Sequence, residues 1–81
     1  MKHFVIVLEW ATDDDGGSNV IGVTHSLEEA KKIFNETAAE EREWAIEHEW
    51  IIYEDIDVMF DAGENGMYSA NHSKLYIQGV N

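Results

Sequence analysis

Cysteine and proline are both absent from the 81 residues. Small secreted domains usually depend on disulfide bonds, so a chain without cysteine is not built like one. Long apolar runs are missing near the start, where the apolar stretch covers only residues 4–8. That stretch is too short for the core of a signal peptide or for a membrane span. We therefore expect a cytoplasmic protein that has no membrane contact.

Basic residues are scarce. Five Lys and Arg stand against 17 Asp and Glu, which gives a formal net charge of −12 at pH 7. A surface of this sign repels nucleic acids and anionic membranes, because proteins bind both through Lys and Arg. It attracts basic proteins. The charge also has a simpler explanation, since a net charge far from zero keeps a small protein soluble. The sequence leaves both interpretations open.

Signatures of catalysis and of cofactor binding are missing too. The sequence has no P-loop, no G-x-G-x-x-G, no G-x-S-x-G and no cysteine nucleophile. Its four histidines lack the helical spacing of zinc ligands. The acidic run Asp13, Asp14 and Asp15 departs from the calcium-loop template, so we interpret it as a turn held open by its own charge, with a weak calcium contact as the alternative. We expect no enzyme, no catalytic residue, no metal ligand and no cofactor.

The apolar residues before position 25 fall in two blocks. Residues 4–10 and 20–24 have the composition of strands. The turn-forming residues 12–19 between them predict a hairpin with a long acidic loop. Gly22 marks either a bulge or a close approach of the backbone.

Ser26, followed three residues later by Glu29, predicts a helix start of the capping-box type. The helical period then continues over residues 27–48. A period of two over residues 50–61 predicts a strand with one packed and one wet face. The packed face would carry Ile52, Ile56, Val58 and Phe60, and the wet face Tyr53, Asp55, Asp57 and Asp61. Asn65 and Gly66 predict a tight turn, and residues 75–78 the last strand.

These elements predict one α+β domain over residues 1–81. Its order is ββαββ, with a mostly antiparallel sheet and one long helix packed on one face. We expect the strand order 2-1-3-4, in which sequential neighbours are antiparallel. A chain of this length has room for one core layer and little room for a deep active site.

The predicted helix has two distinct faces. Its apolar stripe contains Leu27, Ala30, Phe34, Ala38 and Ala45. Its acidic stripe contains Glu29, Glu36, Glu40, Glu43 and Glu47. Glu41 falls on the apolar side, where snorkelling at the edge is the only explanation that the sequence offers.

The acidic stripe is the sharpest functional feature. Glu36, Glu40, Glu43 and Glu47 recur every three or four residues. They place a charge every ~4.5–6 Å along a helix, and a DNA strand carries one per ~3.4 Å. The stripe therefore resembles the charge pattern of DNA, and we expect it to bind a basic, nucleic-acid-binding protein. The alternative is an ordinary solvated helix face. The expected partner-binding residues are the five stripe glutamates together with Asp13, Asp14, Asp15, Asp55 and Asp57.

Three tryptophans are many for a chain of this length: Trp10, Trp44 and Trp50. Tryptophan is enriched at protein interfaces. One interpretation is that they form the rim of a small core. The other is that they are exposed and make an aromatic contact, so that the chain is a non-enzymatic interaction or self-assembly module and forms a homodimer.

Short sequence patterns carry a resemblance that spans most of the chain. They comprise residues 4–10, Gly22-Val23, residues 26–30, Tyr68, Asn71-His72 and Tyr76-Ile77. In these the chain resembles a class of small acidic domains of bacteria, phages and prophages to which no activity is attached. The resemblance implies a ββαββ domain and a mobile-element setting. In that setting the chain is similar to phage inhibitors that mimic DNA against host defence proteins, anti-CRISPR proteins among them.

Overall fold

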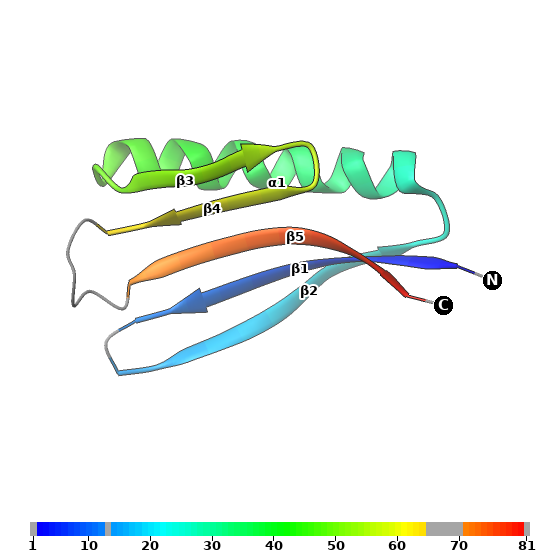
Figure 1. Cartoon of the computed structure of the whole chain (residues 1–81), viewed down its shortest axis with the longest axis horizontal. Helices are drawn as coiled ribbons and strands as arrows, with labels where there is room; N and C mark the ends of the chain where they lie inside the picture. The colour runs from blue at the N-terminus through cyan, green and yellow to red at the C-terminus, as the bar shows by residue number, and fades with distance from the viewer. Residues whose placement is uncertain (1, 13, 65–70, 81) are drawn as a thin grey trace.

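The computed structural model consists of one helix packed against a five-stranded antiparallel sheet (Figure 1). It describes residues 2–12, 14–64 and 71–80. The elements are β1 (His3–Ala11), β2 (Gly16–Thr24), α1 (Leu27–Glu47), β3 (Ile51–Ile56), β4 (Met59–Gly63) and β5 (His72–Val80). The α+β class and the single long helix on one face are confirmed.

The strand order differs from the expected 2-1-3-4. The observed order is β2-β1-β5-β4-β3, so the first and last strands of the chain pair in the middle of the sheet. Burial explains why β5 takes a central place. Leu75 is fully buried, with Leu8 of β1 opposite it on one side and Phe60 of β4 on the other. α1 therefore connects the two edge strands β2 and β3.

The expected single strand over residues 50–61 is divided by a reversal at Asp57 and Val58. Two-residue turns are usually signalled by Asn-Gly or Asp-Gly. This turn has Val58 in the place of glycine, so the sequence gives no turn signal there. The expected face assignments are wrong in part for this reason, although Ile52, opposite Ala62, does share the helix side with Phe60. Ile56 lies opposite Met59 on the face away from the helix, whereas Phe60 is buried on the helix side. The Asn65-Gly66 turn lies outside the described residues.

The core lies between α1 and the sheet. Ala30, Phe34, Ala38 and Ala45 of the expected stripe are buried, and Leu27 remains 41% exposed. On the sheet side the buried residues are Ile6, Phe60, Ala62 and Leu75.

Both expectations for Gly22 are confirmed. The register between β1 and β2 shifts beside it, and a Cβ at this position would lie 3.2 Å from Cδ1 of Ile33. Glycine thus lets the helix approach β2 closely. Ser26 caps the helix and accepts a hydrogen bond of 3.5 Å from the backbone N–H of Glu29.

The outer face of the sheet carries no helix among the described residues. Cross-strand partners project to the same side, so the register places one apolar row across all five strands of this face. The row consists of Val20, Val7, Tyr76, Met59 and Ile56. Its ends are open to solvent, with Val20 63% and Ile56 53% exposed.

Candidate functional site

The five stripe glutamates lie on one regular helix and are all exposed. Their spacing keeps them on one side of α1, because residues three and four apart are neighbours on a helix surface. The opposite side of α1 packs on the sheet through Phe34 and three alanines. The glutamate row (Glu29, Glu36, Glu40, Glu43 and Glu47) is therefore carried by a supported element.

The acidic loop lies at the β1–β2 connection. Asp14 and Asp15 are exposed there, and Asp13 lies outside the described residues. Asp15 Oδ1 accepts a hydrogen bond of 2.8 Å from the backbone N–H of Gly16, and the Asp15 carbonyl accepts one of 2.7 Å from the N–H of Thr12. These bonds are those of a self-contained turn.

The sheet acids do not form a second line of charge. Asp55 lies on the helix side, where Arg42 donates to it through Nη2 at 2.7 Å and through Nε at 2.8 Å. These hydrogen bonds lower the pKa of the Asp55 carboxyl. Asp57 lies in the β3–β4 turn, and Asp61 faces the other side of the sheet beside Lys74. The expected common face of Asp55, Asp57 and Asp61 is therefore wrong, because the chain reverses between them.

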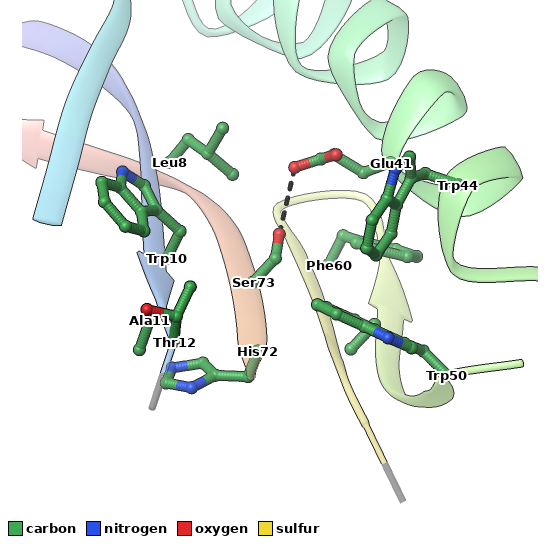
Figure 2. A pocket seen from close by; sticks show the side chains of 11 residues that line it. Leu8, Trp10, Ala11, Thr12, Glu41, Trp44, Trp50, Phe60, His72 and Ser73 are labelled. Atoms are coloured by element: carbon green, nitrogen blue, oxygen red, sulfur yellow. Dashed lines mark hydrogen bonds between the residues drawn. The ribbon is translucent and has the colours of Figure 1, made fainter. Parts of the chain in front are cut away.

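An aromatic pocket opens between α1 and the sheet, with a volume of about 230 Å³. Figure 2 shows Leu8 and Trp10 on one side of it and Trp44 and Trp50 on the other. All three tryptophans of the chain line this one pocket. Sequence reasoning placed them on a core rim or on an exposed patch and did not bring them together.

Sheet register builds the floor of the pocket. Ala62, Ser73 and Trp10 are consecutive cross-strand partners on β4, β5 and β1. Gly17 of β2 is the next partner beyond Trp10. A Cβ at Gly17 would lie 3.2 Å from Cζ2 of Trp10, so glycine makes room for the indole over the edge strand.

The end of α1 builds the opposite wall. Glu49 has a positive φ of 58°, its N–H donates to the carbonyl of Ile46, and the N–H of Trp50 donates to the carbonyl of Ala45. This is the Schellman pattern of helix termination, here with glutamate in the position that glycine usually takes. The pattern folds Trp50 back against Trp44.

The aromatic wall consists of rings in fixed contact. The ring centroids of Trp44 and Trp50 lie 4.6 Å apart with the rings at 85°. The His48 ring stacks on the Trp44 ring with the ring centroids 3.7 Å apart. His48 Nδ1 also donates a hydrogen bond to the Trp44 carbonyl, and this bond helps to hold the imidazole in place. Two tryptophan rings thus meet at nearly a right angle beside the pocket.

Among the described residues, Glu41 is the one carboxylate that lines the pocket. It occupies the helix position between the buried Ala38 and Ala45, and this explains its place on the apolar side of the sequence pattern. Ser73 Oγ donates a hydrogen bond of 3.0 Å to its Oε1 (Figure 2). Within the described residues Glu41 has no ion pair, and no Lys or Arg lines the pocket. The break in the apolar stripe was the sequence signal for this site.

Other kinds of site have no support in the described part of the chain. No three His, Asp or Glu residues there converge closely enough to hold a metal ion. The helix within residues 2–12, 14–64 and 71–80 is too polar to cross a membrane. In comparisons with known proteins, no family model, curated protein or solved structure matches the chain.

Proposed function

We propose that the chain is a non-catalytic acidic binding protein that attaches to a basic protein surface through the glutamate row of α1. The observation that carries this proposal is the exposure of all five glutamates on one side of a 21-residue helix. A rigid row of like charges acts on an oppositely charged groove as a unit, and it accelerates association through long-range attraction.

The C-terminal half of the row is the part expected to dominate. Lys32 lies one turn from Glu36, so it weakens the field at that end of the row. Arg42 is turned away toward Asp55. Glu40, Glu43 and Glu47 therefore form the most uniformly negative stretch.

The partner class that this pattern fits is a protein with a basic nucleic-acid-binding groove. From Glu36 to Glu47 the row repeats charge every ~4.5–6 Å, within a factor of two of one DNA strand. It is a single row, since the sheet acids add no second one. We propose that the partner of this row is a host defence protein of the kind that phage DNA mimics inhibit.

The test compares two variants that carry the same change in charge. The row variant is E36K/E40K/E43K/E47K. The control is D14K/D15K/E54K/D57K, which reverses four exposed acids away from the row. Each is immobilised beside the wild-type chain, and bacterial basic proteins are captured at about 50 and about 200 mM salt, where contacts of this kind weaken steeply.

The expected result is that the wild-type chain and the control capture the same partner, that duplex DNA displaces it and that the row variant does not bind it. Circular dichroism checks that the helix is intact in each variant. Equal losses in the two variants would mean that only overall charge matters, and capture by the row variant would refute the proposal outright.

Self-association is a second candidate, and the uncovered outer face of the sheet favours it. The apolar row there ends in strongly exposed residues, and Val23 at 58% and Tyr53 at 60% exposure lie near it. A second copy of the chain would cover this apolar row of the sheet and would leave the glutamate row of α1 free. The tryptophans do not lie on this outer face, because all three line the pocket between α1 and the sheet, where Trp44 is 42% exposed.

Sedimentation velocity tests this second candidate. A dimer held by apolar contact should persist at high salt, and V20K/V23K should convert it to a monomer. A wild-type chain that sediments as a monomer at all accessible concentrations rules out the homodimer.

A further inference from the structure

We propose that the aromatic pocket is a binding site for a quaternary ammonium group and that Glu41 is its counter-ion. The proposal does not rest on the glutamate row. It rests on three features of the pocket: the walls are aromatic, the one carboxylate among the described lining residues has no ion pair, and the volume is small.

The carboxylate gives the sign of the ligand. Glu41 is half-buried on the apolar side of α1 and has a single hydrogen bond, from Ser73. Its Oε2 has no hydrogen-bond partner within the described residues. This oxygen is open to water, so it is available to a cation that enters the pocket. The net charge of −12 adds attraction at long range.

The walls suit a cation that keeps an apolar surface. Trp44 and Trp50 stand at 85° to each other, and Trp10 lies across the opening from them (Figure 2). Tryptophan is the strongest cation–π partner among the aromatic residues, and cages of such rings are the usual means of recognising quaternary ammonium groups.

Counting acceptors separates a quaternary ammonium from lysine and arginine. A lysine ammonium brings three donors and a guanidinium five. Among the lining residues, Thr12 Oγ1 already exchanges hydrogen bonds with the backbone of Asp15, and Ser73 Oγ is bonded to Glu41. Glu41 is the one carboxylate acceptor among the described lining residues, so most donors of a lysine or arginine would have to keep their water at the pocket opening. A quaternary ammonium has no donor to satisfy.

Size points to a small head group. The volume of about 230 Å³ is below the ~300–1,000 Å³ of sites for drug-sized ligands. It suits a trimethylammonium group, whether on a free small molecule or at the end of a trimethylated lysine side chain.

Intrinsic fluorescence gives a direct readout, because every tryptophan of the chain lines the pocket. Tetramethylammonium chloride is titrated at constant ionic strength, with sodium chloride replaced ion for ion. We expect a saturable change in the emission. Choline should act in the same way, and 3,3-dimethyl-1-butanol, its uncharged carbon isostere, should bind about tenfold more weakly or not at all.

Two matched variants test the role of Glu41. E41Q keeps the shape and an oxygen for Ser73 but removes the charge, and it should weaken tetramethylammonium binding about tenfold. E43Q removes an exposed charge outside the pocket and should leave binding nearly unchanged. Amide shifts of Ala62 and Ser73 in NMR spectra provide a second measurement that does not depend on fluorescence.

Peptides that contain trimethyllysine or unmodified lysine distinguish the two sources of the group. Tighter binding of the trimethylated peptide than of choline indicates a side chain of a partner, and the reverse order indicates a free small molecule. The absence of a saturable response to tetramethylammonium would overturn the proposal. Equal binding of the uncharged isostere, or of E41Q, would do so as well. The row variant described above should still bind tetramethylammonium, so this site and the proposed function can fail separately.

Discussion

Arg42 and Asp55 form a bidentate ion pair, with Nη2 2.7 Å from Oδ1 and Nε 2.8 Å from Oδ2. The pair joins the C-terminal part of α1 to the edge strand β3. The Arg42 guanidinium also lies over the ring of the buried Phe60, with Cζ 5.7 Å from the ring centroid. The side chains of Arg42 and Asp55 are 40% and 37% exposed, so this is a surface pair whose energy water screens substantially.

Removing this ion pair should lower the free energy of unfolding only slightly, and it should change how that free energy depends on pH. D55N should lower the free energy of unfolding by about 0.5–1 kcal/mol at neutral pH. The hydrogen bonds from Arg42 lower the folded pKa of Asp55. Its contribution is therefore present above the unfolded value of about 4 and is lost as the pH falls through the folded pKa.

Urea denaturation at neutral pH and at about pH 3 checks this linkage. The wild-type chain should lose more stability than D55N between the two conditions. D57N is the control, because Asp57 is exposed in the turn. An equal loss of stability in the wild-type chain and in D55N would contradict the linkage.

The helix end offers a stabilising substitution. Glu49 has a φ of 58°, a conformation that costs an L-residue roughly 1 kcal/mol and glycine almost nothing. E49G should therefore raise the stability by about 1 kcal/mol, or the melting temperature by about 4–8 °C. E49A separates the loss of the charge from the backbone effect and should bring little of this gain. A melting temperature of E49G at or below that of E49A would show that the backbone there is not strained.

The position of the Trp10 indole should depend on the lack of a side chain at Gly17. A Cβ there would lie 3.2 Å from Cζ2 of the indole, so G17V should displace the ring while the sheet remains paired. NMR signals of the indole N–H groups should show Trp10 moving more than Trp44 and Trp50. S18V is the control, because Ser18 lies opposite Glu9 on the other face of the sheet. Similar shifts in the two variants would contradict the close contact.

The core should depend strongly on one residue of the helix. Phe34 is 2% exposed, and truncating such a residue costs about 3–5 kcal/mol. F34A should therefore lose a large part of the free energy of unfolding, which is about 5–15 kcal/mol for a typical domain. The control is I46A on the same helix, where Ile46 is 64% exposed and the change should stay within about 0.5 kcal/mol. Thermal unfolding followed by circular dichroism measures both, and equal losses would place Phe34 outside the core.

Local features of the fold could be predicted from the sequence because they depend on neighbours along the chain. The helix expected over residues 27–48 begins and ends as α1 does, within one residue. The cap at Ser26 follows from the local capping motif. The exposed glutamate row follows from helical spacing. The hairpin of β1 and β2 is also a local structure and was expected. The long loop expected over residues 12–19 is wrong, because β2 begins at Gly16 and pairs with β1 from there on.

Long-range pairing could not be predicted in the same way. The period of two continues through Asp57 and Val58, so nothing in the pattern separates β3 from β4. The central place of β5 depends on which distant strand covers Leu75. Which strands pair with β5 depends on the apolar area that the whole sheet buries, and no short segment of the sequence determines it.

The sequence by itself therefore determined the charge, the helix and its two faces, because charge is a sum over residues and helical faces follow from a fixed rotation per residue. Only the tertiary structure decided that Trp10, Trp44 and Trp50 line one pocket together with Glu41. Those residues come from a strand, a helix and the segment after it. Their meeting is set by the register of Trp10 with Ser73 and by the reversed helix end at Glu49, two geometries that exist only once the sheet and helix have packed.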